Sequence, residues 1–174
     1  LEEYIIGVVA AEMPASFELE ALKAQAVAAR TLAAYKMKAL GGKGCSKYEG
    51  ADVCSDFSHC QAWISESQMK KNWGKSYEDN LQKIKQAVYQ TWGEIMTYNG
   101  KPIEVFFHST SNGKTENVEE VFSASLPYYD VVESPGDKNG PKYSARVSFT
   151  VDEFIRKFES RYGKSNLSRD NIKD

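Results

Sequence analysis

The sequence predicts an α+β fold in which helices pack with a small antiparallel sheet. Three observations predict this class: helical periodicity dominates residues 1–93, strand-like segments follow from residue 94, and one more helical segment comes near the end. Helices and strands that are grouped along the chain, and do not alternate, are typical of α+β proteins. With 174 residues, the chain can form one domain or two subdomains, at about 1–93 and 94–174.

The composition argues against several classes of protein. Hydrophobic residues make up 41% and charged residues 26%, which favours a packed core over a disordered chain. The net charge of −2 argues against a nucleic-acid binder that works through a basic face. No apolar run reaches the roughly 18 residues of a membrane span. Because amphipathic structure begins at Leu1, we expect a natural N-terminus with a signal peptide or anchor to be missing.

Two helices are predicted at the start of the chain. The first covers Leu1–Met13 and ends at Pro14, whose ring cannot continue the helical hydrogen bonds. The second, rich in alanine, covers about Phe17–Leu40, with Ser16 as its N-cap and Gly41-Gly42 after its end. Helical spacing predicts a buried stripe on the second helix that consists of Leu22, Ala26, Ala29, Ala33 and Leu40.

The rest of the predicted elements follow an irregular segment over about 41–67. A third helix is expected over Ser76–Trp92, with Leu81, Ile84, Val88 and Trp92 facing inward. Asn99-Gly100 favours a tight hairpin turn between strands at Glu94–Tyr98 and Ile103–Phe107. Two more strands are expected at Val131–Glu133 and Ala145–Phe149. The last helix, Val151–Tyr162, is preceded by Thr150, which can form a capping box with Glu153.

Glu12 is the first candidate catalytic residue. It ends an apolar helix, where a carboxyl group loses hydration and its pKa is expected to rise. Such a group can hold a proton near neutral pH and give it to a leaving oxygen. The alternative is a surface glutamate, although the C-terminal end of a helix is electrostatically poor for an acid.

Lys23 and Arg30 are seven residues apart on the second predicted helix, so both project from one face. They could clamp an anionic or hydroxyl-rich ligand, or neutralise a carboxylate. Taken alone, a solvated helix face is the simpler interpretation of the pair.

All three cysteines, together with one of the two histidines, fall in the irregular segment. Cys45, Cys54, His59 and Cys60 offer the four ligands of a closed tetrahedral zinc site. Such a metal would be structural, one ion per chain, and would staple a loop that is unusually long for a compact domain. The alternative is a Cys54–Cys60 disulfide with a free third thiol. We favour zinc.

A polar segment, His108 to Gly113, directly follows an apolar predicted strand. Its small hydroxyl residues and its Asn-Gly turn provide the many donors and acceptors that a sugar chain requires. Tyr128 could stack on a sugar ring. An ordinary polar loop and a core tyrosine are the alternatives, and no nucleophile-elbow pattern supports a serine hydrolase.

Three segments together resemble one family. They are Tyr4–Tyr35 with the run VVAAEMP and the run EALKAQAVAART, Cys54–Ala62, and the run FHSTSNGKTE over residues 107–116. This combination is similar to the stage II sporulation protein D family, the SpoIID/LytB type of peptidoglycan lytic transglycosylases. The chain departs from the family where Asn112 replaces a common glycine and where Cys45 stands in place of a histidine at another spacing.

The resemblance implies one catalytic region over residues 1–174, truncated at both termini, around a central substrate cleft. Glu12 would protonate the oxygen that joins N-acetylmuramic acid to N-acetylglucosamine, and the C6 hydroxyl of the muramic sugar would then attack C1 to form a 1,6-anhydro end. One carboxylate suffices because the nucleophile is tethered to the reacting ring. Residues near the site would include Lys23, Arg30, His108, Ser109, Ser111, Asn112 and Tyr128.

The resemblance also implies a setting and partners. The family acts outside the cytoplasmic membrane at the septum between mother cell and forespore, during engulfment, through an N-terminal anchor. It works on peptidoglycan glycan strands with the amidase/endopeptidase SpoIIP and the membrane protein SpoIIM, and peptide-stripped glycan would be the preferred substrate. The rival interpretation is a non-catalytic, glycan-binding amidase enhancer.

Overall fold

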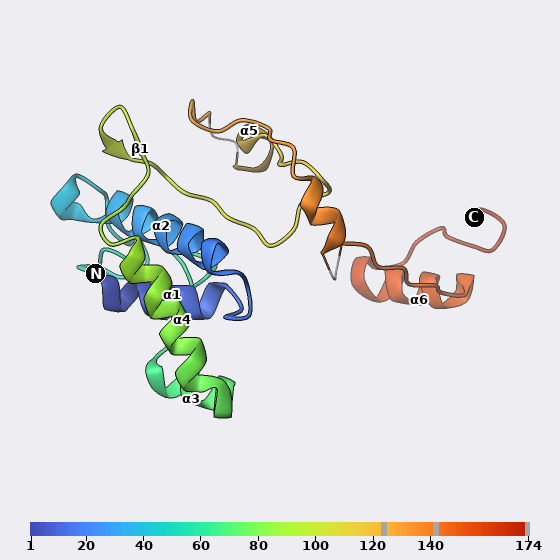
Figure 1. The fold of residues 1–174 in the computed structure, drawn as a ribbon. Helices are drawn as coiled ribbons and strands as arrows, with labels where there is room; N and C mark the ends of the chain where they lie inside the picture. Colours follow the sequence, from blue (N-terminus) through green and yellow to red (C-terminus); the bar gives the residue numbers. More distant parts are fainter. Residues whose placement is uncertain (123–124, 141–142, 173–174) are drawn as a thin grey trace. The chain divides into compact units, whose positions relative to one another are not determined.

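The computed structural model describes residues 1–122, 125–140 and 143–172, and the chain divides into two compact units (Figure 1). The first unit covers Leu1–His108 and the second covers Ser109–Asp174. The regular elements of the first unit are α1 (Glu2–Glu12), α2 (Leu19–Lys36), a 3₁₀ turn (Lys38–Leu40), α3 (Glu66–Trp73), a 3₁₀ turn (Gly74–Ser76), α4 (Tyr77–Gln90), β1 (Thr97–Tyr98) and β2 (Lys101–Pro102). Those of the second unit are α5 (Val118–Phe122), a 3₁₀ turn (Pro135–Asn139) and α6 (Val151–Tyr162).

The core of the first unit lies among α1, α2 and α4, which pack side by side (Figure 1). Small alanines on α2 and α4 let the helix backbones approach closely and exclude water. The helices and small sheet confirm the α+β class. The core side chains that are fully buried are Ile5, Val8, Val9, Leu22, Ala26, Ala29, Ile84, Ala87 and Val88.

Two residues that were predicted to be buried are exposed. Leu40 is 57% exposed and Trp92 is 66% exposed, because both lie beyond the end of a helix. α2 stops at Lys36, where the amides of Gly42 and Gly44 donate to the carbonyls of Met37 and Lys36 at 2.9 and 2.8 Å. The chain thus folds back over the helix end and satisfies carbonyls that a longer helix would use.

The helix starts also differ in part from the predictions. The predicted N-cap Ser16 is wrong, because α2 begins at Leu19 with Glu18 in the cap position and no side-chain hydrogen bond there. α3 was not predicted. Ser65 caps it by accepting a hydrogen bond from the amide of Gln68 at 3.3 Å, but Met69 is its one buried residue. Because only one residue of α3 is buried, its sequence has no helical repeat of apolar residues from which the helix could be predicted.

The hairpin confirms the predicted turn and shortens the predicted strands. Asn99 and Gly100 have φ values of 51° and 75°, the left-handed conformation that a two-residue hairpin turn requires. β1 and β2 pair antiparallel, Thr97 with Pro102 and Tyr98 with Lys101. The strand predicted at Ile103–Phe107 is wrong: one further hydrogen bond joins the Ile103 amide to the Met96 carbonyl at 3.3 Å, and regular pairing then stops.

In the second unit, the predicted helix is confirmed and the two predicted strands are wrong. α6 covers Val151–Tyr162 as predicted, and Thr150 and Glu153 form the capping box. Neither Val131–Glu133 nor Ala145–Phe149 is a strand in the described residues, and a single bridge joins Lys114 to Glu133. Alternating apolar residues need a partner strand to form a ladder. In the described part of the chain, no helix combines the length and the apolar character that crossing a membrane requires.

Candidate functional site

The four predicted metal ligands converge on one point of the first unit. The sulfur atoms of Cys45, Cys54 and Cys60 lie 3.6, 3.4 and 3.3 Å from Nδ1 of His59. All four ligand atoms lie within 4.8 Å of one another. The three thiols are free, so the alternative Cys54–Cys60 disulfide is absent from this structure.

The donor set and its spacing fit a zinc ion. Ligand atoms at 2.0–2.3 Å from a tetrahedral zinc ion lie about 3.5 Å from one another, which matches the three sulfur–nitrogen distances. Nε2 of His59 lies 2.9 Å from Oγ of Ser46, the type of outer hydrogen bond that orients a metal-binding imidazole. Burial opposes ionisation of the Cys45 thiol, but hydrogen bonds from the backbone of Tyr48 and Lys47 lower its pKa.

A tight turn presents the last two ligands. Asp56 accepts hydrogen bonds from the amide and hydroxyl of Ser58 at 2.8 and 2.6 Å, and its carbonyl accepts from the amides of His59 and Cys60 at 3.1 and 2.8 Å. Nζ of Lys47 lies 2.5 Å from the Asp56 carboxylate. These hydrogen bonds, with Lys47 first, hold the pKa of Asp56 well below its usual range, so the ionised carboxylate maintains the turn.

The segment after Cys60 connects the cysteine cluster to Glu12. The amide of Ala62, two residues beyond Cys60, donates a 2.6 Å hydrogen bond to Oε1 of Glu12. The Glu12 side chain is half-buried at the end of α1, where Met13 turns away in an extended conformation. The Ala62 amide orients the carboxylate through Oε1, and within the described residues no hydrogen bond reaches Oε2.

Two further contacts fasten the same segment to α1. The buried Gln61 side chain donates to the Tyr4 hydroxyl at 3.0 Å and to the Ala29 carbonyl at 3.3 Å. The Ile64 amide donates to the Gly7 carbonyl at 3.2 Å. Burial raises the pKa of Tyr4, while the hydrogen bond from Gln61 acts in the opposite direction. Residues 61–64 therefore lie along α1, from its first turns to its end.

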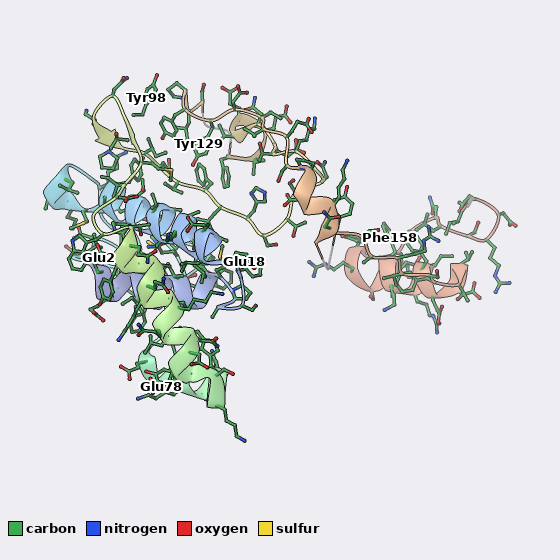
Figure 2. All side chains as sticks on the ribbon, in the orientation of Figure 1. Glu2, Glu18, Glu78, Tyr98, Tyr129 and Phe158 are labelled. Carbon is green, nitrogen blue, oxygen red and sulfur yellow. The ribbon has the colours of Figure 1, made fainter. Side chains whose placement is uncertain are left out.

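Lys23 and Arg30 have different surroundings although both lie on α2. Nζ of Lys23 pairs with the exposed Glu20 carboxylate at 2.6 Å, as a solvated helix face does. Arg30 is 1% exposed and pairs with Glu2 at 2.6 Å, near the start of α1 (Figure 2). Its guanidinium also donates to the carbonyls of Val88 and Glu94 at 3.2 and 3.1 Å. For Arg30 the solvated-face interpretation is wrong, and its contacts join α1, α2, α4 and the segment before β1.

The polar loop is divided between the units. His108 is exposed at the end of the first unit, and Ser109 begins the second. Within the second unit, both the amide and hydroxyl of Ser111 donate to Asp137, at 2.7 and 2.5 Å. The carbonyl of Asn112 accepts from the Tyr143 hydroxyl at 3.0 Å. Ser111 and Asn112 thus lie in a loop that hydrogen bonds tie to Asp137 and Tyr143.

Tyr128 is half-buried and its ring centroid lies 5.3 Å from that of Tyr129. Sequence reasoning did not find Asp137 as the partner of Ser111, or the Ala62 amide as the partner of Glu12. Both pairings join residues far apart along the chain, and a backbone amide leaves no mark in the composition. The sequence offered one hint of the contact between Ala62 and Glu12: Ala62 lies two residues after Cys60, a candidate metal ligand.

A family model described as stage II sporulation protein (SpoIID) matches residues 1–98, more than half of the chain. The chain therefore belongs to the SpoIID family. It is 49% identical over 157 residues to stage II sporulation protein D of Bacillus subtilis strain 168, and 50% identical over 157 residues to that of Bacillus amyloliquefaciens. Each match covers 90% of this chain and 45% of the relative, so the chain spans less than half the length of these relatives.

A relative with a different name also matches. The chain is 39% identical over 122 residues to an amidase enhancer of Bacillus subtilis strain 168, a match that covers 70% of this chain and 14% of the relative. This chain is thus similar both to proteins named for sporulation and to a protein named for enhancing an amidase.

Proposed function

We propose that this chain is a peptidoglycan lytic transglycosylase with Glu12 as its single acid/base. The observation that carries the proposal is the half-buried Glu12 carboxylate, with the Ala62 amide 2.6 Å from Oε1. A general acid has to present one oxygen to the bond that breaks and keep its orientation through the reaction. Belonging to the SpoIID family supports a substrate in the sporulating cell wall.

The proposed reaction uses the two states of this carboxyl group in turn. Protonated Glu12 gives its proton to the glycosidic oxygen as the bond from that oxygen to C1 of N-acetylmuramic acid breaks. The resulting carboxylate then takes the proton of the C6 hydroxyl as that oxygen bonds to C1. The product is a 1,6-anhydro end, no water is consumed, and Glu12 regains its proton. Glycosidases that use water require a second carboxylate.

Zinc belongs to this proposal as a structural ion. Cys45, Cys54, His59 and Cys60 would hold it. Burial raises the pKa of the Cys60 thiol to about 11, so a metal that binds there has to displace a firmly held proton. A bound Zn²⁺ supplies a cross-link that holds the irregular loop together. Residues 61–64 then start from a fixed point and carry the Ala62 amide to Glu12.

The cellular setting is part of the same proposal. We propose that the full-length protein is anchored in a membrane and acts outside the cytoplasm at the septum, with SpoIIP and SpoIIM as partners. In the second unit, Ser109, Ser111, Asn112 and the half-buried Tyr128 would contact glycan. In the first unit, His108 and Lys23 would support glycan binding, and Arg30 would act through the packing of α1 rather than by touching sugar.

Mass spectrometry of the products tests the reaction. Wild-type protein and a Glu12→Gln variant are incubated with peptide-free glycan strands, and we expect anhydromuramic ends from the wild type alone. Glutamine keeps the acceptor for the Ala62 amide, so the variant should bind glycan normally. Reducing ends in place of anhydro ends would mean a water-using hydrolase and would overturn the proposal.

The named amidase enhancer among the relatives supports a second candidate, a glycan-binding module without activity. In that case Glu12→Gln would leave stimulation of an amidase unchanged, and the wild-type protein would bind glycan without cleaving it. The same pair of proteins therefore separates the two functions.

A further inference from the structure

Trp63 occupies a distinctive place next to the candidate catalytic carboxylate. It directly follows Ala62, whose amide lies 2.6 Å from Glu12, and consecutive Cα atoms are about 3.8 Å apart. Its neighbour on the other side, Ile64, is tied to the Gly7 carbonyl at 3.2 Å. The backbone on both sides of the indole is thus fixed to α1, so the ring is held at a set distance from Glu12.

The ring itself rests on α1 at a glycine. A Cβ atom at Gly7 would lie 2.1, 2.5 and 2.8 Å from Nε1, Cδ1 and Cε2 of Trp63. No side chain other than hydrogen leaves room for the indole at that point. The pyrrole half of the ring is therefore seated directly on the helix backbone, which fixes its orientation without covering the rest of it.

The remaining ring surface is open. Trp63 is 40% exposed, although its backbone is fixed on both sides. The other two tryptophans of the chain differ: Trp73 stacks on Tyr77 with centroids 6.4 Å apart, and Trp92 stacks on Tyr89 at 5.7 Å. Among the described residues, no aromatic ring stacks on Trp63. A large, rigid, amphipathic surface that is held in place but left open is typical of a ligand contact.

We propose that Trp63 is a substrate-positioning residue that stacks on a sugar ring beside the bond that Glu12 cleaves. This inference rests on the proposed function and deepens it. The C–H faces of N-acetylated hexoses are apolar and suit an open indole surface, while their hydroxyl edges stay in water. A sugar held against Trp63 would place its glycosidic oxygen toward Oε2 of Glu12, since Oε1 is taken by the adjacent Ala62 amide.

Three variants of the full chain test this role. Trp63→Tyr keeps an aromatic face, Trp63→Leu keeps an apolar contact with Gly7 but has no ring, and Trp92→Leu removes an exposed ring from another part of the first unit. Affinity is measured by titration calorimetry with peptide-free glycan strands and with the N-acetylglucosamine tetramer. Cleavage kinetics on the glycan strands and the melting temperature are measured in parallel.

We expect Trp63→Leu to raise Kd and KM by about tenfold or more, with Trp63→Tyr within about threefold of the wild type and Trp92→Leu unchanged. Equal affinity in Trp63→Leu and Trp92→Leu would overturn the inference. So would equal losses in Trp63→Leu and Trp63→Tyr with lowered melting temperatures, because Trp63 would then act only by packing on Gly7.

The outcomes also separate this inference from the proposed function. If the wild type binds glycan at Trp63 but does not cleave it, the transglycosylase proposal fails and the stacking role stands. If the wild type cleaves glycan and Trp63→Leu has the wild-type KM, the stacking role alone fails. A wild type that neither binds nor cleaves glycan contradicts both.

Discussion

Residues 1–108 and residues 109–174 hold their structure by different means. The first unit has a buried core among α1, α2 and α4, and its one buried ion pair, Arg30–Glu2, lies beside that core. In the described residues of the second unit, Val118 is the one hydrophobic residue that is buried, and side chains of α6 such as Phe154 are exposed. Its elements are held by hydrogen bonds, some within one helical turn, such as that of Thr150 with Glu153, and some between loops, such as that of Ser111 with Asp137.

This difference predicts how the two units respond to change. Burial and long-range contacts make the first unit cooperative. The loss of a single contact should therefore destabilise the whole unit. In the second unit, the rings of α6 pack on one another, as Phe158 does on Phe154 (Figure 2), and the loss of such a contact should stay within the helix. The candidate catalytic carboxylate lies in the cooperative unit.

Removal of zinc should have the largest effect. If zinc is held about a thousandfold above its dissociation constant, its removal costs about 4 kcal/mol of the free energy of unfolding. We expect a chelator to lower the melting temperature by about 10 °C and to expose residues 41–65 to hydrogen exchange. The helix α6 should exchange at its original rate.

Metal analysis and calorimetry on the same sample check this prediction. The expected content is about one zinc per chain, and Cys54→Ser should lose it. A zinc-free sample with an unchanged melting temperature after chelation would show that the cysteine cluster does not staple the loop.

The substitution Arg30→Met should also lower the free energy of unfolding strongly. The variant leaves the Glu2 carboxylate buried without its partner and removes donors from the carbonyls of Val88 and Glu94. Removing one member of a buried pair costs about 3–5 kcal/mol. Urea denaturation measures the loss.

Lys23→Met is the matched control, since it removes a cation from the same helix. Its ion pair with Glu20 is exposed, so the expected cost is at most a few tenths of a kcal/mol. Similar costs for the two variants would contradict the assignment of Arg30 to the core.

Gly7→Ala should have an intermediate effect. The added Cβ would lie 2.1 Å from Nε1 of Trp63, so the indole has to move away from the backbone of α1. Overpacking of this kind costs about 1–3 kcal/mol. We expect a lower melting temperature and a shift in tryptophan fluorescence. Gly136→Ala, in open space in the second unit, should change stability by less than about 0.5 kcal/mol.

Apart from the control variants, Thr150→Ala should have the smallest effect on stability. It removes the cap that the Thr150 hydroxyl gives the amide of Glu153, which is worth about 1 kcal/mol to the helix. Hydrogen exchange should accelerate along α6 and stay unchanged in α1. Faster exchange in both units would show that they unfold together.

The capping box also predicts a pH dependence. Hydrogen bonds from the amide and the hydroxyl of Thr150 lower the pKa of Glu153. A carboxyl group whose pKa is lowered by folding stabilises the helix above its unfolded pKa of about 4.3 and loses this contribution as the pH falls further. The protection factors of the α6 amides, which correct for the intrinsic pH dependence of exchange, should therefore fall in acid, and Glu153→Gln should flatten that fall.

Local signals in the sequence predicted the elements that form locally. Pro14 marked the end of α1 to within two residues, and Thr150 with Glu153 marked the start of α6. Asn99-Gly100 predicted its turn, because few residues adopt positive φ values readily. The spacing of Cys45, Cys54, His59 and Cys60 predicted a cluster because ligand chemistry limits which residues can form one.

Tertiary contacts decided what these signals could not. The predicted strand at Ala145–Phe149 alternates apolar and polar residues, but a strand forms only where another strand accepts its hydrogen bonds. The predicted strand at Val131–Glu133 makes a single bridge, from Glu133 to Lys114. Arg30 looked like a member of a solvated face, yet Glu2 and two carbonyls surround it. Helical spacing places a residue on a face, but only packing decides what that face meets.

The sequence by itself determined the α+β class, the family and the four residues that gather in the cysteine cluster. These depend on composition, residue order and short spacings. Only the tertiary structure decided that the segment after Cys60 lies along α1, with Ala62 on Glu12 and Trp63 on Gly7. Such contacts join residues some 50 positions apart, and they form because packed helices bring distant backbone groups within hydrogen-bonding distance.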